Sequence, residues 1–128
     1  MKIEHLGLQV EDPAAASVWY EENLGFSICR SADEPNPVRF LADSSGVVMM
    51  EMYRNSAISV PDYRSMDPLE LHIALCCDDV DDTVDRLIAA GATSASPAAN
   101  TAAGDRLAML RDPWGVPIQL CRREKTMV

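Results

Sequence analysis

The clearest pattern of apolar and polar positions covers residues 69–92, where a predicted strand leads into a predicted helix. Apolar residues alternate in the strand and recur every three or four positions in the helix, so each element has one apolar face. Asp79 is a predicted helix N-cap, and Gly91 suits the turn that ends a helix. If the strand packs its apolar face under this helix, His72 points to the other side, into solvent or into a cavity. The apolar positions are Leu71, Ile73, Leu75, Val80, Val84, Leu87 and Ile88.

The first part of the chain carries an imperfect copy of this pattern. Residues 2–10 alternate as a strand, which places His5, Gly7 and Gln9 on the face opposite the apolar side chains. Asp12 followed by Pro13 predicts a helix that ends near Gly25. Further strands are predicted at 26–30, 38–42 and 47–54, with a loop at 31–37.

The same order returns in the second half, with strands predicted at 92–96, 106–111 and 116–122 and a loop at 96–104. Equivalent landmarks keep nearly one offset: His5 and His72 are 67 positions apart, and Glu51 and Gln119 are 68 apart. We therefore expect an α+β fold made by tandem duplication of a βαβββ module. The expected organisation is a single domain, 1–128, with modules at about 1–54 and 69–123 and a linker at 55–68.

Composition limits the kind of partner. A chain of 128 residues with 48% apolar and 24% charged residues is typical of an ordinary globular domain. The sequence has no apolar run near the roughly 18 residues needed to cross a bilayer, and its opening does not resemble a signal peptide, so we expect a cytoplasmic protein. The four cysteines show no CxxC spacing and are expected to be reduced thiols. A net charge of −9 argues against nucleic acid and anionic membranes and favours a small-molecule partner.

Four polar side chains lie opposite apolar sets at equivalent positions of the two copies: His5, Glu51, His72 and Gln119. Two imidazoles and a carboxylate suffice to bind Zn, Ni, Fe(II), Co or Mn, and the Gln119 amide is a weak, neutral fourth candidate ligand. Taken singly, each of these residues is more often an ordinary solvated or hydrogen-bonded group. The two histidines are the only ones in the chain, and their equivalent positions favour a metal site.

Four segments, 3–26, 49–55, 72–92 and 112–120, resemble the vicinal oxygen chelate superfamily. That superfamily includes glyoxalase I, the bleomycin and fosfomycin resistance proteins, and extradiol dioxygenases. The resemblance implies paired βαβββ modules that form a U-shaped mixed sheet around a central cavity, with the helices outside, and it implies a homodimer. It places His5, Glu51, His72 and Gln119 at the family's metal-ligand positions. The segment MMEMYRN is especially similar to glyoxalase I, including Asn55 just after the strand.

Two departures from the family pattern bear on the substrate. The last ligand is usually a glutamate, and here it is Gln119, which removes the carboxylate that an extradiol dioxygenase uses in its facial triad. Glu51 would have to replace that carboxylate from another strand. The first-strand arginine that meets the glutathione carboxylate corresponds to Gln9, which weakens the case for a glutathione thioester.

The expectation is a metalloenzyme of lyase, isomerase or dioxygenase-like type. A divalent metal would chelate vicinal oxygens of a small substrate and stabilise an enediolate or oxyanion, with Glu51 as the catalytic base. Gln9, Tyr53 and Asn55 are candidates for substrate binding. The alternative is a metal-free small-molecule binding protein of the bleomycin-resistance type, and a third reading is a purely structural member. The metal content of the purified protein distinguishes the first two.

Overall fold

The computed structural model describes residues 1–47 and 49–127 and divides into two compact units, Met1–Pro61 and Asp62–Val128. The division lies within the segment 55–68, where the sequence predicts a linker. Among the described residues, neither helix has the length and apolar character needed to cross a membrane.

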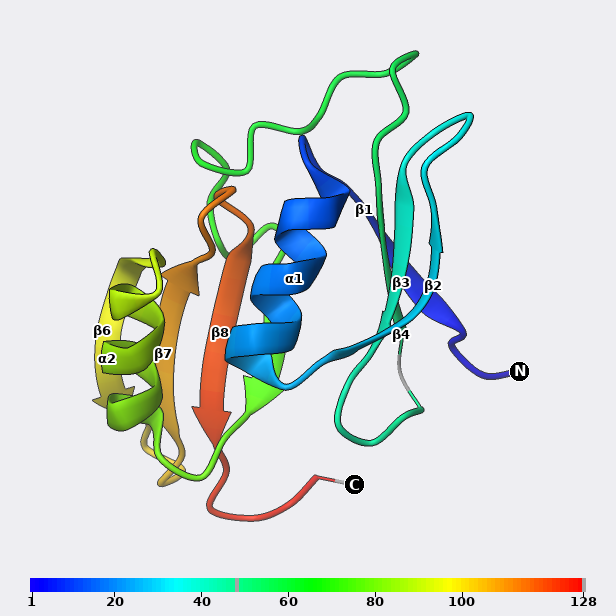
Figure 1. Ribbon diagram of the computed structural model, residues 1–128. Helices are drawn as coiled ribbons and strands as arrows, with labels where there is room; N and C mark the ends of the chain where they lie inside the picture. Colours follow the sequence, from blue (N-terminus) through cyan, green and yellow to red (C-terminus); the bar gives the residue numbers. More distant parts are fainter. Residues whose placement is uncertain (48, 128) are drawn as a thin grey trace. The chain divides into compact units, whose positions relative to one another are not determined.

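The first unit is a four-stranded mixed sheet with one helix (Figure 1). The sheet order is β1-β4-β3-β2, in which β1 and β4 are parallel and the other neighbours are antiparallel. Its elements are β1 (His5–Gln9), α1 (Pro13–Leu24), β2 (Ser27–Ala32), β3 (Val38–Ala42) and β4 (Met49–Tyr53).

The second unit repeats the first. Its sheet order, β5-β8-β7-β6, has the same pattern of one parallel and two antiparallel pairs. Gly7 pairs with Glu51 in the first unit and Ala74 pairs with Gln119 in the second, so even the register is equivalent. The predicted α+β duplication of βαβββ modules is therefore confirmed. The elements are β5 (Ile73–Cys76), α2 (Val80–Ala89), β6 (Thr93–Asn100), β7 (Arg106–Arg111) and β8 (Pro117–Arg122).

Each sheet packs one face against its own helix. Helix α1 contacts β2, β3 and β4, and α2 contacts β6, β7 and β8. Because side chains alternate along a strand, the buried set in each sheet leaves the opposite face to a different set, which contains His5 and Glu51 in the first unit. The buried residues of this alternating set include Leu8, Leu41, Met50 and Met52 in the first unit and Ala108, Leu110, Ile118 and Leu120 in the second.

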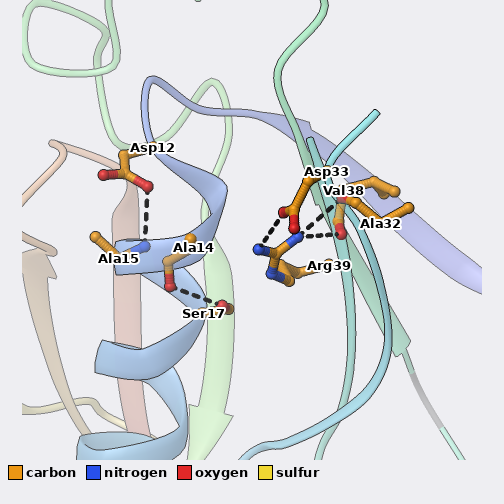
Figure 2. Close-up of polar contacts among 8 residues, drawn as sticks. All are labelled: Asp12, Ala14, Ala15, Ser17, Ala32, Asp33, Val38 and Arg39. Atoms are coloured by element: carbon orange, nitrogen blue, oxygen red, sulfur yellow. Dashed lines mark hydrogen bonds and ion pairs between the residues drawn. The ribbon is translucent and has the colours of Figure 1, made fainter. Parts of the chain in front are cut away.

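Both helices begin and end where the sequence predicts. The Asp12 carboxylate accepts a hydrogen bond from the Ala15 amide at 3.0 Å (Figure 2), and the Asp79 carboxylate accepts one from the Asp82 amide at 3.0 Å. These bonds satisfy amides that have no partner within the helix. After the helices, Gly25 (φ 72°) and Gly91 (φ 99°) take left-handed conformations that a side chain disfavours.

The strand predictions are wrong at several ends: β1 begins at His5 rather than at residue 2, and β2, β6 and β5 differ as follows. Strand β2 extends to Ala32, into the predicted loop 31–37, because Ser31 and Ala32 still pair with β3. There Arg39 donates to the Ala32 and Val38 carbonyls, each at 2.9 Å, and to the Asp33 carboxylate at 2.7 Å (Figure 2). These three bonds fix the start of the loop at 33–37.

The second difference is β6, which runs to Asn100 although the sequence predicts a loop at 96–104. Strand β6 is at the edge of its sheet, where Pro97 is tolerated, and the register shifts on both sides of Ser96. The third is β5, which begins at Ile73, so His72 immediately precedes the strand on which it was predicted. Strand β4 begins at Met49, and Val48 of the predicted strand 47–54 lies outside the described residues.

Candidate metal and substrate site

The parallel pairing of β1 and β4 brings two predicted metal ligands together. The Nε2 atom of His5 lies 3.5 Å from the Oε2 atom of Glu51. Gly7 pairs directly with Glu51, and a Cβ placed on Gly7 would lie 3.4 Å from the same carboxylate oxygen. The absence of a side chain at Gly7 therefore leaves the Glu51 carboxylate room beside the His5 ring.

A second carboxylate sets the orientation of the His5 ring. Its Nδ1–H donates to Oε2 of Glu4 in a close contact, which leaves Nε2 directed toward Glu51. This hydrogen bond to Glu4 raises the pKa of His5 above its ordinary value, and the negative charge of Glu51 adds to the effect. His5 thus stands between two carboxylates, an arrangement that favours a cation at Nε2, either a proton or a metal ion.

The donor atoms of His5 and Glu51 fit a divalent ion in type and spacing. Imidazole nitrogen and carboxylate oxygen are ordinary ligands of Zn and of Fe(II), Co, Ni and Mn. Two donors at about 2.1 Å from a tetrahedral ion stand about 3.4 Å apart. The observed separation of 3.5 Å matches that value. Glu51 keeps 26% of its side-chain surface exposed, so an ion can reach the pair from solvent.

His72, in the second unit, is also held by its Nδ1 atom. That atom lies 2.9 Å from the Pro68 carbonyl oxygen. A carbonyl oxygen only accepts, so Nδ1–H is the donor of this bond. Metal-binding histidines usually donate their other ring N–H to a carboxylate or a backbone carbonyl in this way. His5 and His72 therefore share the same arrangement, with Nδ1 hydrogen-bonded to an oxygen and Nε2 left available.

Gln119 belongs to the second unit as well. It is half-buried on β8, pairs with Ala74 and Met109, and lines a depression of about 250 Å³ together with Asn100. Within 1–47 and 49–127, no three His, Cys, Asp or Glu side chains gather closely enough to hold a metal ion. The structure thus brings together His5 and Glu51, while His72 and Gln119 lie in the other unit.

The predicted substrate-binding residues Tyr53 and Asn55 share one depression with Glu51. It has a volume of about 420 Å³ and is also lined by residues 34–36 of the β2–β3 loop. His5 lines a second depression of about 270 Å³ with Arg30 and Phe40. The His5 and Phe40 rings meet edge to face with centroids 5.5 Å apart.

Strand pairing places a charged residue in line with Glu51. Arg30 pairs with Phe40, and Phe40 pairs with Glu51. Directly paired residues project from the same face of a sheet, so all three lie on the face that carries His5. Arg30 is exposed and lines the same depression as His5. This row places a guanidinium, an aromatic ring and a carboxylate side by side.

Gln9, also predicted to bind substrate, is buried with 4% of its surface exposed. Its side-chain N–H donates to the Ile58 carbonyl at 2.8 Å, and its side-chain oxygen accepts from the Asn55 amide at 3.3 Å. These two bonds attach the segment after β4 to β1. Gln9 therefore positions Asn55, a residue of the Glu51 depression.

Three residues of this face were not predicted from the sequence: Glu4, Arg30 and Phe40. Glu4 precedes β1, and the alternation of apolar and polar residues does not single it out. Its position next to a predicted histidine ligand was a usable clue. Phe40 and Arg30 become neighbours of Glu51 only through the pairing register of β2, β3 and β4, and β2 has an irregularity between Ile28 and Arg30.

The fold and the family follow from comparison with known proteins. Among curated protein sequences, none matches this chain. A glyoxalase family protein from Bacillus cereus superimposes with a TM-score of 0.81 at 18% identity, over 94% of this chain and 93% of that one. A glyoxalase/bleomycin resistance protein from Streptomyces sp. CB03234 gives a TM-score of 0.68 at 23% identity, over 94% and 100%.

Glyoxalase I from Zea mays superimposes with a TM-score of 0.77 at 21% identity, over 98% of this chain and 46% of that one, so this chain spans about half its length. At these identities the likeness concerns the fold. The sequence itself matches a family profile over residues 2–120. This chain belongs to the Glyoxalase/Bleomycin resistance protein/Dioxygenase superfamily.

Proposed function

We propose that this chain is a metal-dependent enzyme of lyase or isomerase type that acts on a small substrate with vicinal oxygens. His5, Glu51 and His72 would hold a divalent ion, with Gln119 as a neutral fourth ligand. When bound, the ion supplies Lewis-acid stabilisation of negative charge on a substrate oxygen.

The observation that carries this proposal is the matched state of the two imidazoles. Each of the two histidines has its Nδ1 on an oxygen, Glu4 for His5 and the Pro68 carbonyl for His72, which leaves Nε2 as the available ligand atom. Two histidines without a common role, 67 positions apart, would not be expected to share this hydrogen-bonding arrangement. The Glu51 carboxylate 3.5 Å from His5 Nε2 supplies an anionic ligand.

Glu51 is the proposed base. Its carboxylate is partly exposed and lines the depression shared with Tyr53 and Asn55, so a substrate placed there meets it directly. The neighbouring Glu4 carboxylate is occupied by the His5 Nδ1–H. A proton taken from a substrate carbon next to a carbonyl would therefore pass to Glu51 rather than to Glu4.

Arg30 supports an anionic substrate. No hydrogen bond or ion pair involves its guanidinium within the part of the chain that the structure describes, while the chain as a whole has a net charge of −9. A free cation on the ligand-bearing face suits a carboxylate on the substrate, since Arg meets carboxylates with paired hydrogen bonds. We propose a substrate that carries vicinal oxygens at one end and a carboxylate at the other.

The test is a metal titration of chelator-stripped protein with Zn, Co, Ni, Mn and Fe(II), followed by calorimetry and metal analysis. One equivalent should bind, and His5→Ala and His72→Ala should each abolish stoichiometric binding. Glu51→Gln should weaken binding at least tenfold, whereas Glu22→Gln, on the exposed surface of α1, should leave it unchanged. If none of the five ions binds stoichiometrically, the metal-free binding-protein alternative replaces this proposal.

A further inference from the structure

Two thiols of the second unit lie side by side at one end of its sheet. Cys76 is the last residue of β5, and it pairs directly with Cys121 of the parallel neighbour β8. Their side chains project from the same face, and the two Sγ atoms are 3.5 Å apart. The contact joins residues 45 positions apart in the chain, so it follows from the strand register rather than from the local sequence.

The two thiols differ in accessibility. Cys76 is exposed, whereas Cys121 has 2% of its surface exposed, and its Sγ also contacts the Leu75 carbonyl at 3.4 Å. Both line a depression of about 420 Å³ whose wall also includes Arg122 and Arg123. A small solute that enters this depression reaches the sulfur of Cys76 before that of Cys121.

We propose that Cys76 and Cys121 form an oxidation site, in which a hydroperoxide converts the two thiols into a reversible intrachain disulfide. The Cys76 thiolate attacks the hydroperoxide, the O–O bond breaks, and a sulfenic acid and an alcohol or water are formed. The Cys121 sulfur then attacks the Cys76 sulfur, the S–O bond breaks, and the hydroxide leaves as water with the Cys121 proton. In sum, two thiols and one hydroperoxide give one disulfide, one alcohol or water, and one water.

The backbone geometry allows this bond. Neighbouring strands are about 4.8 Å apart, and disulfides join Cα atoms at about 4.4–6.8 Å. The sulfur atoms must approach by about 1.5 Å to reach the bond length of about 2.05 Å. A change of side-chain rotamer at Cys76 or Cys121 leaves the backbone pairing of β5 with β8 in place.

The neighbouring Cys77 is a poor partner for either sulfur. It follows the last residue of β5 and also lines the depression, but its side chain is hydrogen-bonded to Thr83 of α2. Its backbone amide donates to the Cys121 carbonyl at 3.0 Å and continues the pairing of the two strands. Its side chain is half-buried, and burial raises the pKa of this thiol. Cys77 and the exposed Cys29 of the first unit therefore serve as internal controls.

The experiment treats the full-length reduced protein with equimolar hydrogen peroxide and follows the intact mass and the proteolytic peptides. The expected product has lost two hydrogen atoms, links the Cys76 and Cys121 peptides, and returns to the starting mass with dithiothreitol. Cys29→Ser/Cys77→Ser should form the same product at the same rate. A disulfide through Cys29 or Cys77, or sulfinic acid at Cys76 with Cys121 unchanged, would overturn the proposal.

Two single variants resolve the order of the steps. Both are made in the Cys29→Ser/Cys77→Ser background: in Cys121→Ala the sulfenic acid on Cys76 should persist and be captured by dimedone, whereas Cys76→Ser should give no dimedone adduct because Cys121 is shielded. Equal capture in both variants would contradict the assignment of Cys76 as the reacting thiol. Circular dichroism establishes that each variant is folded, and the mapping in the unsubstituted protein needs no variant. None of these readouts requires a bound metal, so the oxidation site is tested independently of the proposed function.

Discussion

His5 and Glu51 lie diagonally across the parallel strands β1 and β4, with 3.5 Å between imidazole Nε2 and carboxylate Oε2. Three features of the first unit produce this relationship: the register of β1 on β4, the missing side chain at Gly7, and the Glu4 carboxylate on the other ring nitrogen. The register sets the spacing of the two side chains, Gly7 leaves room for the carboxylate, and Glu4 orients the imidazole ring. Each can therefore be changed separately, and so can the equivalent positions of the second unit.

Gln119→Glu should tighten metal binding, because an anionic oxygen replaces a neutral one. We expect at least a tenfold gain in affinity, which corresponds to about 1.4 kcal/mol. Calorimetric titration with Zn measures it. The matched control is Asn100→Asp, which adds the same charge to the wall of the same depression. If the two variants gain equally in metal affinity, the gain comes from the added negative charge alone and Gln119 is not a ligand.

Gly7→Val should lower metal affinity without loss of fold stability. Even a Cβ at this position would lie 3.4 Å from Glu51 Oε2 and 3.5 Å from the Tyr53 ring, so the larger valine displaces the carboxylate from His5. Valine is favoured in strands, so urea unfolding should show no destabilisation. The equivalent change in the second unit, Ala74→Val, faces the neutral Gln119 and should affect affinity less. A larger loss in Ala74→Val would contradict the central role of Glu51.

The sequence predicts best those features that depend on neighbours in the chain. Asp12 and Asp79 identify the helix starts because a cap is a contact over three residues. The duplication is visible because His5 and His72 retain their offset, and the structure confirms it in the pairing of Gly7 with Glu51 and of Ala74 with Gln119.

Features that depend on pairing between strands are not visible in the sequence. Strand β6 continues past Pro97 because it is an edge strand, and nothing local reveals which strand is at the edge. Arg30 reaches the Glu51 row through an irregular register, and the sulfur contact of Cys76 requires the pairing of β5 with β8. Of the predicted ligands, the structure brings together His5 and Glu51.

Arg106→Gln should destabilise the protein at neutral pH and lose this effect in acid. Arg106 forms two bonds with Asp81, at 2.5 and 2.6 Å, and this hydrogen bonding lowers the pKa of Asp81. A carboxyl group with a lowered folded-state pKa contributes stability above its unfolded pKa, about 3.8–3.9, and that contribution disappears as pH falls through the folded value. Because Asp81 is exposed, the effect should be small.

Urea unfolding of Arg106→Gln, Asp81→Asn and the double variant at several pH values measures this coupling. The interaction free energy should be present at pH 7 and absent below the folded-state pKa of Asp81. A coupling that stays constant down to pH 2 would show that the contact is not ionic.

Gln9→Met should destabilise the first unit by about 1–3 kcal/mol, because the Asn55 amide loses its side-chain partner and the Ile58 carbonyl keeps only the Arg54 guanidinium. Urea unfolding measures the change. Ile58→Ala is the control, since the Ile58 side chain is 54% exposed and only its backbone meets Gln9. Unchanged stability of Gln9→Met together with weaker ligand binding would instead favour direct substrate contact by Gln9.

Arg30→Gln should weaken binding of a ligand with a distal carboxylate but not of its shorter analogue. The probes are 2-oxoglutarate and 2-oxobutyrate, which share the vicinal oxygens and differ in the second carboxylate. A hydrogen-bonded ion pair contributes about 1.5–3 kcal/mol, so the preference of the metal-loaded protein for 2-oxoglutarate should fall roughly tenfold or more. Arg30→Lys should retain part of that preference, because it keeps the charge but not the planar fork. Calorimetry provides both affinities, and Lys2→Gln controls for the loss of one surface charge. An equal loss for both probes would place Arg30 at the chelating end of the ligand, and no loss for either would remove it from the site.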